Sequence, residues 1–218
     1  LLVCATMSLV GLCISSCGVG YRNIGSGDLT VQRRDVPAFT SVTVIDDFDI
    51  DITVGGPPSL DVIVDDNLTD EVITQVTGND LTIKHTGATG VDFSVLPRIV
   101  IVTTHLEQVG NQANGLIVVR DVQTEQFAVK NSGLGGVEIG GTTDRVTINK
   151  TDGVIATTDL IAKQVVFDIN GDGIVIVTAT EALVGKARGT GLLIHFGNPE
   201  LINIDNGPGF NILARTTP

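Results

Sequence analysis

The sequence predicts an all-β protein: a right-handed parallel β-helix (β-solenoid) that follows a less regular N-terminal β part containing one short helix. The first observation is a unit repeated between residues 105 and 214, in which a Gly-containing turn separates two apolar runs. The second is that these runs are rich in β-branched residues and too short for helices, which is typical of strands. Six turns carry the repeat: Asn114-Gly115, Gly133-Leu134-Gly135-Gly136, Thr151-Asp152-Gly153, Gly171-Asp172-Gly173, Gly189-Thr190-Gly191 and Gly207-Pro208-Gly209.

The spacing of these turns indicates a solenoid. Their last glycines, at positions 115, 136, 153, 173, 191 and 209, are 21, 17, 20, 18 and 18 residues apart. A unit that repeats at such a period cannot bury its apolar face alone, and stacking of neighbouring units creates the core. An antiparallel sandwich of hairpins is the alternative, because Asp-Gly turns also connect hairpin strands. We favour the solenoid because the whole unit repeats and not only the turn.

Residues 28–104 are expected to form the N-terminal β part, and residues 105–218 the solenoid repeats of the same domain. In the first segment, alternating apolar and polar residues predict strands at 29–31, 41–45, 48–54, 60–64, 81–83 and 98–103. The segment from Asn67 to Val76 is expected to be the short helix, with Asn67 as its N-cap and acidic residues in its first turn. Asp65 and Asp66 are interpreted as part of the same capping.

The first 27 residues predict export and lipid attachment. Residues 1–16 carry no charge and are interpreted as a lipoprotein signal peptide, since a membrane span needs about 20 apolar residues. Ile14-Ser15-Ser16-Cys17 resembles the bacterial lipobox, so Cys17 is the expected lipidation site. Residues 17–27 would then be a tether, and Gly18 after the cysteine favours the outer membrane. A plain signal peptide, or a membrane anchor that happens to contain a cysteine, is the alternative.

Composition and motifs exclude several function classes. The formal net charge is −12, from 13 Lys and Arg against 25 Asp and Glu, whereas nucleic-acid recognition needs a basic footprint. No catalytic residue and no cofactor are predicted, because His85, His105 and His195 are scattered and the motifs of metalloproteases, serine hydrolases and dinucleotide-binding proteins are missing. A carbohydrate-active enzyme with paired carboxylates is a less favoured alternative, since the chain has no Trp and one Tyr as sugar platforms.

Two acidic segments could hold a cation, but each has a simpler interpretation. Asp168-x-Asn170-x-Asp172-Gly173 copies the start of an EF-hand calcium loop, yet Ala179 stands where that loop needs a bidentate Glu. We interpret this segment as one more turn. Asp46-Asp47-x-Asp49-x-Asp51 places alternate carboxylates about 7 Å apart on one strand face, and we interpret the row as a solvated face that protects a sheet edge. No metal site is therefore predicted.

Several short blocks together resemble a known family. They are Gly25-Ser26-Gly27, then Arg34-x-Val36-x-x-Phe39-x-x-Val42-x-Val44, then Leu60-x-Val62 with Asp65-x-Asn67-Leu68, and finally Gly197-Asn198-Pro199-Glu200-Leu201 before Asn206-Gly207-Pro208-Gly209. This combination is similar to the bacterial head GIN domain family (DUF2807, "putative auto-transporter adhesin") over about residues 25–214. Members typically show Ser-Gly-Ser-Gly-Asp at each coil, and here only Gly25-Ser26-Gly27-Asp28 keeps most of it. The resemblance implies a β-helical protein of the cell envelope.

The expected function is that of a non-enzymatic cell-envelope lipoprotein with an adhesin-like binding or interaction role. Its expected partners are the membrane, through the lipid anchor on Cys17, and a surface glycan or protein ligand. Self-association into a homo-oligomer is also expected, because an uncapped end of a β-helix offers open strand edges. The alternative is a structural or partner-binding envelope protein in a stress or signalling system.

Overall fold

The computed structural model describes residues 22–87 and 90–215. The predicted signal peptide, the lipidation site Cys17 and the tether up to residue 21 lie outside the described residues. In the described part, strands β1 to β17 form one 15-stranded and one two-stranded sheet, and a single short 3-10 helix is present. The all-β class is confirmed.

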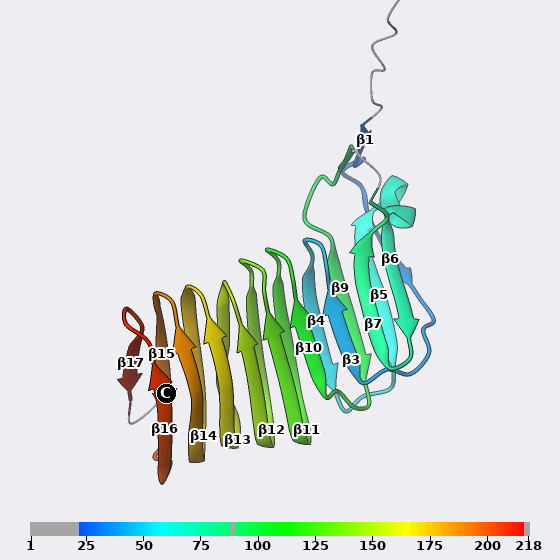
Figure 1. Cartoon of the computed structure of the whole chain (residues 1–218). Coiled ribbons are helices and arrows are strands. Elements are labelled where there is room, and N and C mark those ends of the chain that lie inside the picture. Colours follow the sequence, from blue (N-terminus) through cyan, green and yellow to red (C-terminus); the bar gives the residue numbers. More distant parts are fainter. Residues whose placement is uncertain (1–21, 88–89, 216–218) are drawn as a thin grey trace, which may run out of the picture.

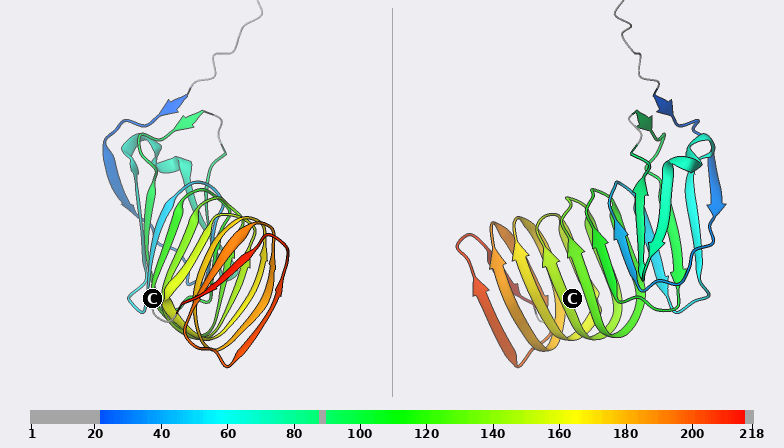
Figure 2. Two further views of the ribbon diagram at one scale, coloured as in Figure 1. Left: turned by 90° about the vertical axis from the view of Figure 1, so that its left-hand side faces the viewer. Right: turned by 45° about the vertical axis from the view of Figure 1, so that its right-hand side comes forward.

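The regular part is a stack of parallel coils (Figure 1). Its strands are β11 (Leu116–Asn131), β12 (Gly136–Lys150), β13 (Val154–Asn170), β14 (Gly173–Arg188), β15 (Gly191–Phe196), β16 (Leu201–Asn206) and β17 (Asn211–Ala214). Phe127 of β11 is the register partner of Val146 in β12, and Val146 is that of Val165 in β13. One coil is therefore 19 residues long at this position. Viewed along the stack, the coils lie behind one another as flattened loops (Figure 2). The β-solenoid is thus confirmed, and the antiparallel sandwich is not adopted.

Each long strand contributes to both faces of its coil. The N-terminal half of β11 pairs with β4 (Asp49–Val54), whereas its C-terminal half pairs with β10 (Gln108–Asn111). The register of β11 against β12 shifts between Val119 and Val122, and Asp121 there has a positive φ of 62°. The chain therefore turns from one face to the other within a continuous strand.

The order of strands in space departs from their order in the sequence at the N-terminal end. β3 (Ser41–Val44) lies between β10 and β7 (Asp80–His85), and β4 lies between β11 and β9 (Arg98–Thr103); all four pairings are parallel. The chain thus builds the β3–β4 layer first, adds β7 and β9 on its outer side, and crosses back to start β10 on its inner side.

Antiparallel strands close this end of the stack (Figure 1). On one side β6 (Val72–Thr77) pairs with β7, and on the other β5 (Ser59–Asp65) pairs with β9 and with β2 (Leu29–Arg33). Separately, β1 (Asn23–Ile24) pairs with β8 (Val91–Asp92). The apolar side chains beneath, such as Leu60, Leu81 and Ile101, are fully buried.

The expected helix over residues 67–76 is wrong in type and extent. The structure has a 3-10 helix, η1, over Asp66–Glu71, and Val72 already begins β6. Asn67 does not cap this helix, because its side chain bonds to Ser26 and to the carbonyl of Ile24 instead. Pairing with β7 outweighs the helical pattern, since Val72, Ile73 and Val76 suit a strand equally well.

The core consists of stacked rows of inward side chains. One row contains Ile99, Ile50, Ile117, Val137, Ile155, Val175, Leu193 and Ile212. All of them except the terminal Ile212 are buried, and burial of such a side chain contributes about 1.5–3 kcal/mol. In another row Gly185 follows Phe167, and a Cβ on Gly185 would lie 2.6 Å from the phenyl ring. The small residue makes room for the large one.

A ladder of polar side chains supports the turns from inside. The Nδ2 of Asn111 donates to the carbonyl of Gly115 over 3.0 Å, and that of Asn131 donates to the carbonyl of Gly135 over 2.9 Å. Lys150 occupies the same position of the next coil, is buried, and donates from its ammonium to the carbonyl of Asp172. This burial lowers the pKa of Lys150. The ladder was not predicted, although the spacing Asn-x-x-x-Gly at 111–115 and 131–135 is its signal in the sequence.

Candidate functional site

The three histidines considered as catalytic candidates occupy unrelated environments. His85 packs between Phe48 and Phe93, with ring centroids 4.6 and 5.0 Å away. His195 is buried, and burial lowers its pKa. His105 is exposed beside Glu107. Within residues 22–87 and 90–215, no group of three or more His, Cys, Asp or Glu side chains is arranged to hold a metal ion.

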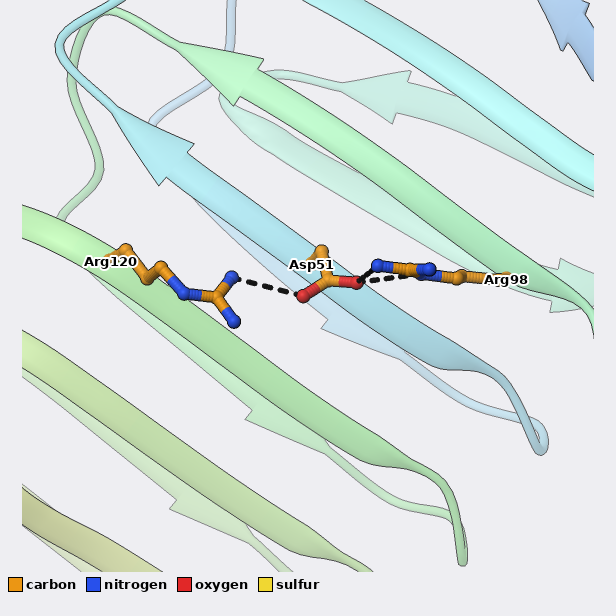
Figure 3. Close-up of polar contacts among 3 residues, drawn as sticks. All are labelled: Asp51, Arg98 and Arg120. Carbon is orange, nitrogen blue, oxygen red and sulfur yellow. Dashed lines mark hydrogen bonds and ion pairs between the residues drawn. The ribbon is translucent and has the colours of Figure 1, made fainter.

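The acidic row of residues 46–51 does not protect a sheet edge, because β4 is an inner strand between β9 and β11. Asp51 lies between Arg98 and Arg120, whose guanidinium groups donate to its carboxylate over 2.7 and 3.0 Å (Figure 3). Although burial raises the pKa of Asp51, hydrogen bonds from Arg120 and Arg98 outweigh it and lower that pKa. The row therefore joins three parallel strands, and the prediction of a solvated edge is wrong.

The other carboxylates of this row bond to the next coil. Asp47 accepts hydrogen bonds from the backbone and side chain of Asn114, and Asp49 accepts one from the backbone of Leu116. The segment that copies an EF-hand loop behaves similarly, since Asp172 accepts from the backbone and hydroxyl of Thr190. These acidic side chains hold coils together.

A polar groove of about 720 Å³ lies where β3 and β10 begin, beside residues 124–128 of β11. Its lining includes Ser41, His105, Glu107, Gln108, Thr124 and Gln126. His105 Nε2 is 3.2 Å from the Glu107 carboxylate, and Gln108 Nε2 donates to Ser41 Oγ over 3.1 Å. Hydroxyl, amide and carboxylate groups thus point into one depression.

A second groove of about 450 Å³ continues along the same face, with Gln108 lining both. Strand register places one outward residue of each coil in a row: Gly110, Lys130, Asn149, Asp168, Lys186 and Asp205. Neighbours in such a row are about 4.8 Å apart. We call this row, together with Gln108 and the lining of both grooves, the polar face. It offers donors, acceptors and both signs of charge at regular intervals.

The opposite side of the solenoid carries an apolar face. It is formed by outward side chains of β13, β14, β15 and β17: Val154, Ala156, Ile174, Ile176, Leu192, Ile194 and Leu213. Val154, Ile174 and Leu213 are exposed, and the others are half-buried. Contiguous exposed apolar patches mark interaction sites in soluble proteins.

Two of the sequence blocks that carried the family resemblance meet in space. The carboxylate of Asp65, fully buried, accepts from the backbone of Gly27 over 2.8 Å and from the backbone and hydroxyl of Ser94 over 2.9 and 2.6 Å. Asn67 accepts from the backbone of Ser26. Although burial raises the pKa of Asp65, these hydrogen bonds outweigh it and lower that pKa. The blocks therefore form a clamp between the chain entry and the N-terminal end of the stack. Asp65 stands at the N-cap position of η1 as predicted, but its side chain makes no capping hydrogen bond and serves the clamp instead.

Neither outer face could be assigned from the sequence. Alternation within one strand shows which residues share a side, but only the register between coils shows which of them become neighbours. The available signals were the runs Ile174-Val175-Ile176-Val177 and Leu192-Leu193-Ile194, in which outward as well as inward positions are apolar.

The family model described as "Putative auto-transporter adhesin, head GIN domain" (DUF2807) matches residues 38–199. No curated protein matches the sequence. In the described residues, no helix has the length and apolar character needed to cross a membrane.

Solved structures share the fold at low sequence identity. A "putative adhesin" from Bacteroides fragilis is 19% identical with a TM-score of 0.74, over 88% of this chain and 99% of its own. A "putative lipid binding protein" from Parabacteroides distasonis is 18% identical with a TM-score of 0.54, over 88% of this chain and 100% of its own. A "putative adhesin" from Parabacteroides merdae is also 18% identical with a TM-score of 0.54, over 89% and 99%.

Proposed function

The chain belongs to the head GIN domain family, and from this premise we propose that the protein is a non-enzymatic, adhesin-like binding module of the bacterial cell envelope. The family and two of the structural neighbours described above are named as adhesins and not as enzymes. The observation that supports a binding role most directly is the polar face, where two grooves share Gln108. A row of amides, hydroxyls and charges at coil spacing suits a ligand that repeats along its length, such as a polysaccharide.

A ligand-binding experiment tests the polar face. The purified protein would be run through native gels that contain dextran, alginate or chitosan, which represent neutral, anionic and cationic polysaccharides. We expect at least one of them to retard the protein, and the double variant Gln108→Ala/Lys130→Ala to bind it at least tenfold more weakly. Glu138→Ala is the matched control, because Glu138 is exposed on the other side of the solenoid. Retardation by none of the polymers, or equal loss in the control, would contradict the assignment.

Lipid attachment at Cys17 and an outer-membrane location are further parts of the proposal. They rest on the lipobox-like Ile14-Ser15-Ser16-Cys17, because the small residues fall directly before the cysteine. Attachment of more than one acyl chain gives stable membrane anchoring.

Protease treatment of intact cells, with the wild-type protein and the Cys17→Ser variant side by side, tests location and anchoring together. We expect the wild type to be digested from outside and the variant to leave the membrane fraction. A variant that stays with the membrane contradicts lipidation at Cys17. A protected wild type contradicts adhesion at the cell surface, and the search would then turn to periplasmic partners.

The apolar face favours a second candidate, a partner-binding envelope protein. Such a protein would keep its partner through Ile174 and its neighbours and show no affinity for polysaccharides. In-cell crosslinking from a photoreactive residue at position 174 distinguishes the two candidates. A single crosslinked partner that is lost in Ile174→Lys supports partner binding, and the lack of one together with polysaccharide binding supports the adhesin.

A further inference from the structure

Exposed apolar side chains gather where the described chain enters the fold. We call them the entry patch, and they are Ile24, Leu29, Val31, Val95 and Leu96. Between 44% and 63% of the surface of each residue is exposed. Figure 1 shows β1, which contains the first of them, at the N-terminal end of the stack, beyond the ends of β5 and β9.

The buried carboxylate of Asp65 brings the first three residues of the patch together. Ile24 precedes Gly25, which lies so close to this carboxylate that a Cβ there would clash with it. Leu29 is the register partner of Asp65 in the antiparallel pair of β2 and β5, so the two side chains share a face. Val31 lies two residues further along β2 and therefore points to the same side.

The same carboxylate holds the other two residues of the patch. Val95 and Leu96 directly follow Ser94, whose backbone and hydroxyl both donate to Asp65. Three segments that are remote in sequence thus place their exposed apolar side chains around one fixed point. A contiguous exposed apolar surface of this kind marks a site of interaction with a protein or a membrane.

This inference rests on the acylation of Cys17 proposed above, which places a lipid surface within reach of the entry patch. β1 begins at Asn23, six positions after Cys17. Six residues span at most about 22 Å even when fully extended. From Asn23 onward the chain is fixed to the domain, because the backbone of Asn23 donates to the carbonyl of Gly90 and that of Gly25 to the carbonyl of Asp92. The anchor therefore keeps the entry patch close to the bilayer.

The charge of the chain favours apolar over electrostatic contact with a membrane. Proteins that adsorb to anionic lipids do so through clusters of Lys and Arg, whereas this chain carries a net charge of −12. The arginines Arg22 and Arg33, which lie in the same segment as the patch, are paired with Asp92 and Asp61. Apolar side chains gain from burial in the membrane interface without any opposite charge. A bilayer with zwitterionic head groups is therefore the surface that fits.

We propose that the entry patch docks onto the bilayer that holds the lipid anchor and inserts its side chains at the boundary between head groups and acyl chains. The acyl chains on Cys17 keep the domain at the membrane, and the patch holds it there in one orientation. Asp65 is the positioning residue of this surface, because it fixes Gly27 and Ser94 to the end of β5.

Tryptophan fluorescence of the full chain, acylated in the cell and reconstituted into phosphatidylcholine vesicles, tests the docking. The chain has no Trp, so Val31→Trp introduces a single reporter in the entry patch. Ile161→Trp is the matched control, because Ile161 is 52% exposed on β13, remote from the patch. We expect vesicles with brominated acyl chains to quench at least half of the fluorescence from position 31 and to leave that from position 161 unchanged.

Removal of apolar side chains tests the patch itself. Leu29→Asp and Leu96→Asp, added together to the Val31→Trp chain, should reduce the quenching at least fivefold while the protein still floats with the vesicles. Leu134→Asp with Leu201→Asp makes the same change at two exposed leucines elsewhere and should leave the quenching as it was. Equal Tm values for these proteins show that the fold is retained.

The possible results separate docking from anchoring. Docking is overturned, and the anchor stands, if the protein floats with the vesicles but position 31 is not quenched, or is quenched no more than position 161. In that case the patch is left for a protein partner. Quenching that survives Leu29→Asp with Leu96→Asp also overturns docking. A protein that does not float at all contradicts the anchor on Cys17, and docking fails with it.

Discussion

Single polar side chains inside the coils stabilise this fold through hydrogen bonds to the backbone. Asn131 is buried, and its one amide group donates to the carbonyls of Gly135 and Val154, which belong to successive coils. The side chain thereby adds a donor to the Gly135 carbonyl, which also accepts from the backbone of Val154, and links the two coils. Each hydrogen bond of this kind contributes about 0.5–1.5 kcal/mol to stability.

We predict that Asn131→Ala lowers the free energy of unfolding by about 1–3 kcal/mol, because the two hydrogen bonds from its amide to the carbonyls of Gly135 and Val154 are lost. Urea unfolding followed by circular dichroism measures the change. Asn149→Ala is the control, since Asn149 is exposed on the polar face and its loss should change stability by less than about 0.5 kcal/mol. Equal effects of the two substitutions would contradict the role of the ladder.

His195 makes the last coil sensitive to acid. It is an inward residue of β15, its Nδ1 has no hydrogen-bond partner, and burial lowers its pKa. The unfolded chain, with an ordinary histidine pKa of about 6.5, therefore binds a proton more readily than the folded chain. Stability is full above this value and falls as the pH drops below it, towards the lowered pKa of the folded state.

We predict that His195→Leu removes the part of this pH dependence that lies between pH 6.5 and the lowered pKa. Tm values measured from pH 8 to pH 5 for both proteins test it. His105→Gln serves as the comparison, because it removes a histidine beside Glu107 and leaves the buried His195 in place. A wild-type profile that His195→Leu leaves unchanged would show that another group causes the acid sensitivity.

At the scale of the turn, glycine is required mainly because the backbone of the neighbouring coil leaves no room for a Cβ atom, and less because of a positive φ angle. Gly115, Gly135, Gly153 and Gly173 follow one another along the stack, and a Cβ on each of the last three would lie 2.1–2.2 Å from the carbonyl oxygen of the glycine before it. Gly153 and Gly173 also have positive φ, but Gly115 and Gly135 do not. These turns therefore need glycine mainly because of the backbone of the neighbouring coil.

We predict that Gly135→Ala lowers the free energy of unfolding by about 3 kcal/mol, at the upper end of the usual cost of overpacking, because rigid backbone atoms cannot give way. Gly110→Ala is the control: Gly110 lacks a positive φ, and its nearest contact would be an ordinary 3.8 Å to Thr43 Oγ1. Thermal unfolding of both variants checks the difference. If Gly135→Ala were as stable as Gly110→Ala, the coils could separate enough to admit a methyl group.

At the scale of the whole molecule, the two ends of the solenoid differ. The N-terminal end is closed by antiparallel strands and fastened to the entering chain through Asp65, whereas up to residue 215 the other end finishes with the parallel strands β16 and β17. The closed end is also the end from which the predicted lipid tether departs. The polar and apolar faces lie along the sides between these ends.

We predict that Asp65→Ala loosens the entering chain while the coils remain folded. Limited proteolysis should then cut between residues 22 and 28 at least tenfold faster than in the wild type, since Gly27 and Ser94 lose their shared acceptor. Asp28→Asn, an exposed change in the same segment, should keep the wild-type rate. Faster cutting that is spread over the whole chain would indicate general unfolding and contradict the clamp.

The sequence by itself determined the fold class, the coil length and most strand positions, because these depend on local properties: β-branched runs, alternation and turn glycines at a fixed period. It did not distinguish a short 3-10 helix followed by a strand from a helix over residues 67–76, since the same apolar residues suit both. It also placed Asp51 on an edge, although β4 lies inside the sheet between two arginine-bearing strands. Whether a strand is an edge or an inner strand depends on pairing partners remote in sequence.

The tertiary structure alone decided three features. They are the placement of β7 beside β3 and of β9 beside β4, the clamp between the segments around Gly27 and Asp65, and the two outer faces. Each of these arises from contacts between residues that are tens of positions apart, whose register no local pattern encodes. The position in the stack likewise decides that Leu183 is core and Ile202 is exposed, although the two residues have the same place in the repeat. A repeating sequence specifies the coil, and the position of a coil in the stack determines its neighbours.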